Sequence, residues 1–295
     1  MMARIKRLLA ATDLSAPARH AAERAALLAT EAGGTLDLLH VIAAGPLGKL
    51  RQLVREVPAD AEQRLVDAVR EEVRQLAGNL LSQHGVTAGV HVVLGTVIHR
   101  LNEEADALGA DLIVLGARGT SFVQHLLLGS TAEKMVSRAA RPLLVVKQPP
   151  HERYRRLLVP IDFSPASLPA LRLARALAPA AELVLLHAFD VPFEGKLRLA
   201  GVSEEAVTYY RAAARDEALQ RMRELLAGAG IALEEARLLV RHGDPWRNIV
   251  EQEQEQDCDL IVMGRHGEGM LEEFFLGSVT KRVLMDCQAD VLVSV

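Results

Sequence analysis

The sequence predicts an α/β protein made of two tandem doubly wound domains, each a five-stranded parallel sheet sandwiched by helices. Two observations lead to this fold class. The chain has 295 residues and is 50% hydrophobic but only 3% aromatic, which indicates aliphatic cores and more residues than one core usually organises. The chain also repeats itself, since LLAATDLSAPA at 8–18 returns as LLVPIDFSPAS at 157–167, and TLDLLHV at 35–41 returns as ELVLLHA at 182–188.

The repeat sets the expected domain limits. A further pair of matching segments, ADLIVLGARG and CDLIVMGRHG, keeps the same register. Between the copies, Pro149 and Pro150 are followed by residues of mixed charge, which neither continue a strand nor start a helix easily. We therefore expect a first domain at 1–147, a linker at 148–156 and a second domain at 157–295.

Each element of the first copy follows from its residue pattern. Short aliphatic runs alternate with longer segments of helical periodicity, as in a βα repeat. Ser15 is expected to cap the first helix and Gly33 to end it. The expected strands are 5–12, 35–41, 90–94, 111–116 and 142–147, and the expected helices are about 16–31, 59–83, 97–107 and 131–139.

Ligands of doubly wound sheets bind at the carboxyl ends of the strands, near the switch in strand order. Asp13 follows the first strand, and Asp162 is its counterpart in the second copy. The pattern Asp-x-Ser also fits a simple helix cap, so the aspartates have two open interpretations. His40 and His187 end matching strands, and we expect them to be half-buried, hydrogen-bonded structural residues.

A glycine motif in both copies is harder to explain by turns alone. It reads G-x-x-G, nine residues, then G-S. Glycines let backbone N–H groups approach a phosphate closely, and a serine at a helix start adds a hydroxyl where the helix dipole is positive. The motif therefore predicts a cradle for an oxyanion in each domain.

This spacing, with an aspartate after the first strand, resembles the nucleotide-binding form of the universal stress protein family. The resemblance covers nearly the whole chain, twice, and it implies that ATP binds in each domain. It implies that Pro160, Asp162 and Ala188 surround adenine and ribose in the second domain. It also implies that the ribose and phosphates are held there by Met263, Gly264, Gly267, Gly277, Ser278 and Val279.

The first domain has a matching set with one departure. Ala11 stands where the second copy has Pro160, so the adenine wall differs. The loop before the last glycine also differs, because only the second copy carries acids there, at Glu268, Glu272 and Glu273. We expect shape to outweigh screened charge, which favours the second site. The residues implied in the first domain are Ala11, Asp13, Val41, Leu115, Gly116, Gly119, Gly129, Ser130 and Thr131.

The resemblance implies a regulatory function in which ATP occupancy sets conformation or the binding of an unknown protein client. Mg²⁺ would be held mainly through the phosphates. No Ser-His-Asp order or paired acid set predicts a fast hydrolase, so we expect at most a slow ATPase. Two alternatives stay open: an ATP hydrolase or adenylyl-transfer enzyme of a related nucleotide-binding fold, and an interaction module with decayed pockets.

Composition limits partners and location. A net charge of −4 gives no broad positive field for nucleic acid. No segment reaches the roughly 18 apolar residues of a membrane span. The chain has 2 cysteines, which predict no disulfide framework and fit the cytoplasm. The apolar segments 142–146 and 290–295 are expected to pair antiparallel as an internal pseudo-dimer, and further dimerisation of the chain stays open.

Overall fold

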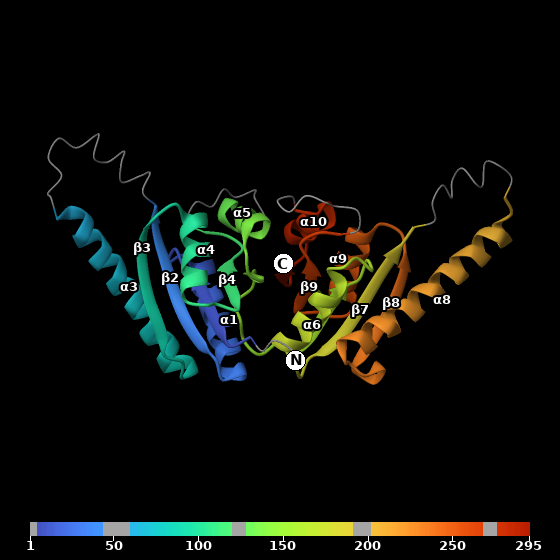
Figure 1. The fold of residues 1–295 in the computed structure, drawn as a ribbon, viewed down its shortest axis with the longest axis horizontal. Helices are drawn as coiled ribbons and strands as arrows, with labels where there is room; N and C mark the ends of the chain where they lie inside the picture. Colours follow the sequence, from blue (N-terminus) through green and yellow to red (C-terminus); the bar gives the residue numbers. More distant parts are fainter. Residues whose placement is uncertain (1–4, 44–59, 120–127, 191–201, 268–275) are drawn as a thin grey trace. The chain divides into compact units, whose positions relative to one another are not determined.

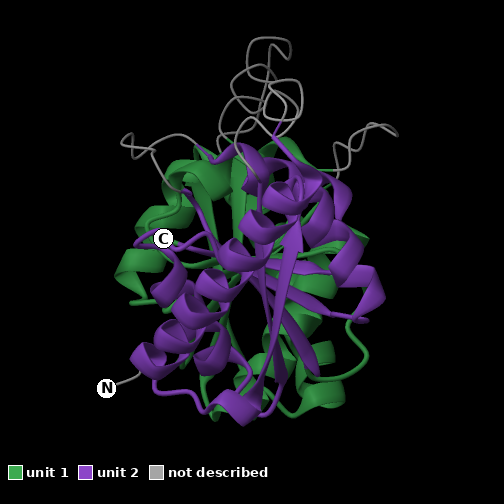
Figure 2. Cartoon of the chain, turned by 90° about the vertical axis from the view of Figure 1, so that its right-hand side faces the viewer, with its two compact units in different colours: residues 1–153, 295 green, residues 154–294 purple. Residues whose placement is uncertain are grey.

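The computed structural model describes residues 5–43, 60–119, 128–190, 202–267 and 276–295 (Figure 1). The chain divides into two compact units, residues 1–153 with Val295 and residues 154–294 (Figure 2). The division falls inside the segment 148–156 that the sequence suggests as a linker.

Unit 1 alternates strands and helices from its first strand to its last. Its elements, in chain order, are β1 (Arg7–Ala11), α1 (Ala16–Ala32), β2 (Thr35–Ala43), α3 (Ala61–His84), β3 (Ala88–Gly95), α4 (Val97–Ala107), β4 (Leu112–Gly116), α5 (Ser130–Arg138) and β5 (Leu143–Val146). The strands are parallel, in the order β3-β2-β1-β4-β5. Helices α1 and α3 contact one another, as do α4 and α5, and each pair covers one face of the sheet.

Unit 2 repeats this plan. Its elements are β6 (Arg156–Pro160), α6 (Ser167–Leu177), β7 (Glu182–Phe189), α8 (Glu204–Ala229), the 3-10 helix η1 (Leu233–Glu235), β8 (Ala236–His242), α9 (Pro245–Glu255), β9 (Leu260–Gly264), α10 (Ser278–Asp286) and β10 (Asp290–Ser294). The strands are again parallel, in the order β10-β9-β6-β7-β8. The predicted α/β fold class of two doubly wound domains is confirmed. The predicted pairing of β5 with β10 stays a prediction.

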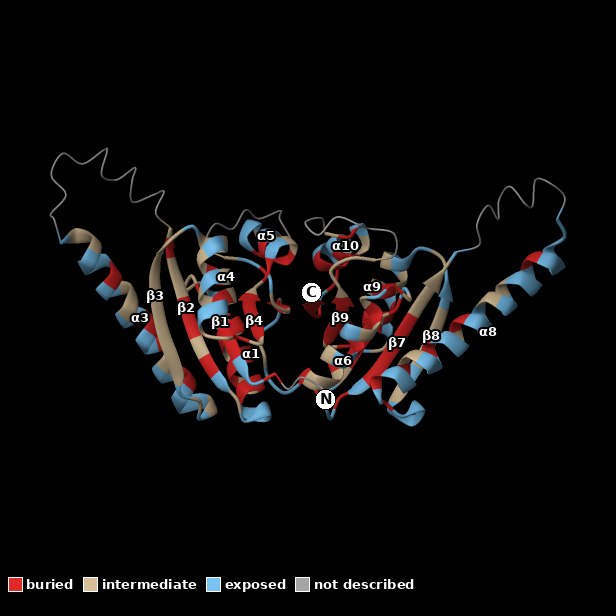
Figure 3. Ribbon diagram, in the orientation of Figure 1, coloured by how far each residue is buried: buried red, intermediate tan, exposed pale blue. Residues whose placement is uncertain are grey.

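Burial is most complete along two neighbouring strands of each unit. β4 and β9 are buried up to their final glycine (Figure 3), and every residue of β5 and of β10 is buried. Apart from the final glycines, the side chains of β4, β5 and β9 are Leu, Ile, Val and Met, because a parallel strand covered on both faces has no solvent side. The residues that follow β4 and β9 therefore begin at a buried strand end.

Local sequence signals set the helix ends. Ser15 has extended backbone before α1, and its Oγ accepts a hydrogen bond from the N–H of Ala18 at 3.4 Å. Gly33 ends α1 in the left-handed conformation, with φ at 58°, which costs glycine little. Both predictions for this helix are confirmed.

The strand order reverses between β1 and β4 in unit 1 and between β6 and β9 in unit 2. From β1 the chain moves outward through β2 and β3, and then returns to the other side of β1 at β4. The loops that leave the carboxyl ends of these central strands run in opposite directions, which opens a crevice.

Candidate functional site

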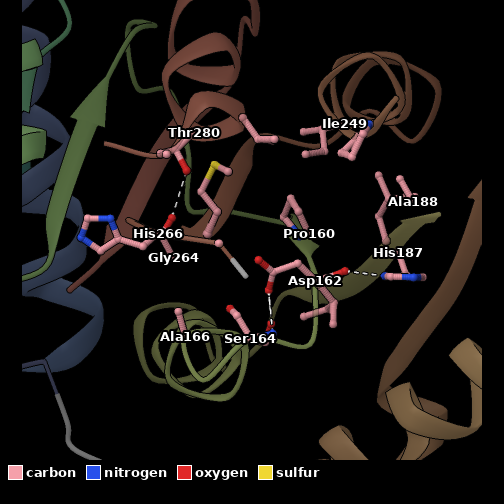
Figure 4. Close-up of a pocket in the computed structure, with 18 of the residues that line it drawn as sticks. Pro160, Asp162, Ser164, Ala166, His187, Ala188, Ile249, Gly264, His266 and Thr280 are labelled. Atoms are coloured by element: carbon pink, nitrogen blue, oxygen red, sulfur yellow. Dashed lines mark hydrogen bonds between the residues drawn. The ribbon is translucent and has the colours of Figure 1, made fainter. Parts of the chain in front are cut away.

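A cavity of about 330 Å³ lies at this switch point in unit 2 (Figure 4). It falls within the size range of small-molecule sites. Every residue that the sequence suggests for this domain lines it: Pro160, Asp162, Ala188, Met263, Gly264, Gly267, Gly277, Ser278 and Val279.

Unit 1 has a cavity of about 530 Å³ at the same place in its own sheet. Its lining also contains every residue that the sequence suggests for the first domain: Ala11, Asp13, Val41, Leu115, Gly116, Gly119, Gly129, Ser130 and Thr131. Segments more than a hundred residues apart in the chain thus meet at one crevice in each unit. The acids Glu268, Glu272 and Glu273 lie outside the described residues.

The aspartate after the first strand of each unit organises a tight turn. Ser15 donates to Asp13 Oδ1 from its backbone N–H at 3.1 Å and from its Oγ at 2.5 Å. In unit 2, Asp162 Oδ1 accepts from the N–H of Ser164 at 2.9 Å and from Ser167 Oγ at 2.8 Å. The helix-cap interpretation is therefore correct for Ser15, while the aspartates hold the turn and also line the cavities.

Both turns contain a residue in the left-handed region that is not glycine. Leu14 has φ at 64° and Phe163 has φ at 61°. Such a conformation is costly for a branched or bulky side chain and persists only where the surroundings fix it. Its occurrence at matching positions shows that both turns are held in the same strained shape.

The first glycine of the motif allows the glycine loop to pack against the helix that follows the first strand. A Cβ at Gly116 would lie 2.8 Å from the backbone oxygen of Pro17. A Cβ at Gly264 would lie 2.7 Å from the Cβ of Ala166. Either contact is too short for a side chain, so close packing explains these two glycines without any ligand.

The second glycine faces the aspartate. A Cβ at Gly119 would lie 2.4 Å from Asp13 Oδ2, and one at Gly267 would lie 2.9 Å from Asp162 Oδ2. The glycine loop and the carboxylate therefore form opposite sides of one narrow space. The sequence does not suggest this pairing, because the two residues lie about a hundred positions apart.

The third glycine corrects one expectation from the sequence. The N–H of Gly129 donates to the backbone oxygen of Ala117 at 2.7 Å, and the N–H of Gly277 donates to the backbone oxygen of Arg265 at 3.1 Å. Both amides therefore bond inside the glycine loop. Each glycine instead serves as the N-cap residue of α5 or α10. The first N–H groups of those helices have no acceptor within the helix and lie at its positive end. Donors for an anion therefore come from the helix start.

Helices α4 and α9 contribute a wall that neither the glycine motif nor the family resemblance indicates. Val97 and Leu101 line the cavity of unit 1, and Pro245 and Ile249 line that of unit 2. Each pair is spaced i, i+4 and therefore lies on one helix face. This periodicity, directly after Gly95 and Gly243, is the signal that identifies the wall.

The strand-end histidines are half-buried, as expected. His187 lines its cavity, and its Nδ1 donates to the backbone oxygen of Ile161 at 2.7 Å. Burial lowers the pKa of His187 despite that hydrogen bond, and the nearby Arg221 lowers it further. Burial also lowers the pKa of His40, although the carboxylate of Asp13 opposes the effect. Both imidazoles therefore favour the neutral form.

A basic or titratable residue precedes the second glycine of each loop. Arg118 lines the cavity of unit 1, and His266 lines that of unit 2. The ring of His266 points away from Asp162 and Thr280 in Figure 4. The hydroxyl of Thr280 donates to the backbone oxygen of Gly264 at 3.1 Å and so ties α10 to the loop.

Among the residues that the structure describes, no helix combines the length and the apolar character of a membrane span. The same residues contain no cluster of three or more His, Cys, Asp or Glu side chains placed to hold a metal ion. Cys258 and Cys287 are buried and form no disulfide, and burial raises the pKa of the Cys258 thiol to about 12.

A solved structure shares the fold over nearly the whole chain. A universal stress protein from Archaeoglobus fulgidus superposes with a TM-score of 0.71 at 20% identity, covering 99% of this chain and 98% of that one. Another universal stress protein was solved in complex with cAMP and is 23% identical over 49% of this chain and 98% of its own, with a TM-score of 0.36.

Proteins of similar sequence are universal stress proteins as well. A universal stress protein of Mycolicibacterium smegmatis is 27% identical over 97% of this chain and 96% of its own length. One from Methanocaldococcus jannaschii is 30% identical over 48% of this chain and 94% of its own length. The profile of the Universal stress protein family matches residues 4–147 and again residues 153–294. The chain therefore belongs to the universal stress protein family, as a form with two such domains in tandem.

Proposed function

We propose that each unit binds ATP in its cavity, and that occupancy regulates conformation or the binding of a protein client in a cytoplasmic stress response. The observation that carries the proposal is the lining of the two cavities. In each unit, one crevice gathers all the residues that the motif and the family resemblance suggest.

Adenine and ribose fit the side of each cavity formed by the first two strands. Pro160 and Ala188 offer an apolar wall in unit 2, and Ala11 and Val41 offer one in unit 1. A carboxylate beside that wall, such as Asp162, accepts hydrogen bonds from ribose hydroxyls or from the adenine amino group. This combination of an apolar face with one acceptor suits a nucleoside.

The phosphates fit the opposite side, at the N-termini of α5 and α10. Ser130 and Ser278 are the first residues of these helices and are exposed at the cavities. Their hydroxyls and the first helical N–H groups together favour a polyanion. Mg²⁺ would be bound mainly through the phosphates, and would neutralise part of their charge.

Turnover is expected to be slow. Two imidazoles line the cavity of unit 2: the Nδ1 of His187 already bonds to the backbone, and the ring of His266 points away from Asp162 (Figure 4). A general base must reach the attacking water in a productive geometry. We expect fewer than about one ATP hydrolysed per second, measured by phosphate release. A faster rate that a single cavity substitution abolishes would favour the enzyme alternative.

The nucleotide that co-purifies with the protein tests the ligand directly. The full chain would be purified without added nucleotide and denatured by heat, and the released small molecules identified by mass spectrometry. ATP or ADP at up to two per chain supports the proposal. Nucleotide-free protein that also fails to bind added ATP would contradict the proposal. Recovery of cAMP alone would show that the ligand is cAMP and not ATP.

A further inference from the structure

Three side chains from three elements form a stack beside the cavity of unit 2. The guanidinium carbon of Arg221, on α8, lies 4.0 Å from the centroid of the Phe163 ring. The Phe163 ring lies 4.5 Å from the His187 ring, centroid to centroid, at an angle of 45°. His187 in turn donates to the backbone oxygen of Ile161. The stack thus starts on α8 and ends on the backbone just before Asp162.

This stack acts on the strained turn. Phe163 is the left-handed residue of the turn, directly between Asp162 and Ser164. Its ring has a cation on one side and an imidazole close by, so both contacts favour this conformation. If the ring moved, the turn would relax, and Asp162 would leave its place opposite Gly267. The position of the carboxylate therefore depends on Arg221 through Phe163.

The corresponding turn of unit 1 is surrounded by different side chains. Its left-handed residue is Leu14, an aliphatic side chain that offers no face to a cation. The charge that α3 brings near His40 is the carboxylate of Glu72, whereas α8 brings the guanidinium of Arg221 near His187. The sign of the charge is thus reversed between the two units.

We propose that Arg221 is a positioning residue for the nucleotide site of unit 2, holding the Asp162 turn through Phe163 and His187 and so coupling that site to α8. The inference rests on the proposed ATP binding. It adds that the two sites differ in how they are preorganised, because only the turn of unit 2 is supported by this cation–aromatic stack among the described residues.

The test uses the full chain carrying Gly129→Val, which fills the phosphate side of the unit 1 cavity and leaves the site of unit 2 to be titrated with ATP by calorimetry. Arg221→Met should weaken binding about two- to fivefold, the equivalent of an exposed cation–π contact. Arg221→Lys keeps the cation and should restore affinity. Phe163→Leu copies unit 1 and should weaken binding to a similar degree.

A matched control and a spectroscopic readout complete the design. Arg223 is another exposed arginine of α8, and Arg223→Met should leave ATP affinity unchanged. Arg221→Met should raise the pKa of His187, measured by NMR titration of its ring protons, because it removes a neighbouring positive charge.

Equal ATP affinity in Arg221→Met and its parent would overturn the inference while leaving the proposed function intact. A loss that Arg221→Lys does not restore would also overturn it. A parent Gly129→Val chain that binds no ATP contradicts the proposed function itself, and the inference with it.

Discussion

The two cavities share one backbone frame but differ in the side chains that fill it. The cavity of unit 1 measures about 530 Å³ and that of unit 2 about 330 Å³. Ala11 in the first corresponds to the bulkier Pro160 in the second, and Arg118 corresponds to His266. Asp13 is half-buried whereas Asp162 is exposed.

This difference separates what the fold requires from what a ligand would require. The motif glycines have equivalent neighbours in both units. The first lies against the helix that follows the first strand, the second against the aspartate before that helix, and the third against the backbone of the glycine loop. These contacts set the shape of the crevice. The residues that differ set its volume and charge, so the two sites should bind the same class of ligand with different affinities.

The largest expected effect comes from the first motif glycine. Gly116→Ala and Gly264→Ala should each lower the free energy of unfolding by about 1–3 kcal/mol through overpacking, measured by urea denaturation. The obstacles differ, however. The added methyl group meets a backbone oxygen of Pro17 in unit 1 but only the Cβ of Ala166 in unit 2.

A second substitution sharpens that comparison. Ala166 is the N-cap residue of α6, and replacing it by glycine removes the Cβ that the added methyl group would meet. Ala166→Gly should therefore restore most of the stability lost in Gly264→Ala. No substitution can relieve the corresponding clash in unit 1, because the atom that a Cβ at Gly116 meets is the backbone oxygen of Pro17. No recovery in the double variant would show that Gly264 is not required for close packing against Ala166.

The next effect concerns affinity and the second motif glycine. In Gly119→Ala the new Cβ would meet Asp13 Oδ2 at 2.4 Å, and in Gly267→Ala it would meet Asp162 Oδ2 at 2.9 Å. A carboxylate at the end of a side chain can move away, so the fold should survive while ATP loses an acceptor. We expect the dissociation constant for ATP, measured by calorimetry, to increase about tenfold. The increase should be larger in Gly119→Ala than in Gly267→Ala. Unchanged affinity in both variants would exclude these aspartates from the site.

The smallest effect is a pH dependence of stability that both units share. The pKa of His40 and that of His187 are lowered in the folded protein from an ordinary value of 6.5, so the unfolded chain takes up these protons first. Stability should be complete above that value and decline as the pH falls through the folded pKa values.

Urea denaturation at about pH 7.5 and about pH 5.5 measures this decline. The double variant His40→Gln, His187→Gln should lose less stability on acidification than the parent chain. An equal loss in both proteins would mean that the histidines do not cause it.

The fold can be predicted from the sequence because its signals are local and repeated. Aliphatic runs indicate the strands, Ser15 and Gly33 indicate the ends of α1, and the second copy repeats the pattern. The aspartates and glycines that line each cavity can also be predicted, since the carboxyl ends of β1 and β4, or of β6 and β9, must lie side by side.

The remaining features depend on distances between segments far apart in the chain. The approach of Gly119 to Asp13 and the stack of Arg221 on Phe163 leave no pattern in the local sequence. The hydrogen bonds that the amides of Gly129 and Gly277 make inside the loop also leave no local pattern, so the sequence alone suggests that these amides face phosphate.

The central claim is that both cavities are nucleotide sites, and the stoichiometry of ATP binding tests it most directly. Titration calorimetry would compare the parent chain with Gly129→Val and Gly277→Val. A Cβ at Gly129 would lie 3.3 Å from the backbone oxygen of Ala117, and one at Gly277 would lie 3.3 Å from the backbone oxygen of Arg265. Valine at either position should therefore fill the phosphate side of its own cavity. The account predicts about two sites in the parent and about one in each variant. ATP binding that is unchanged in both variants would contradict it.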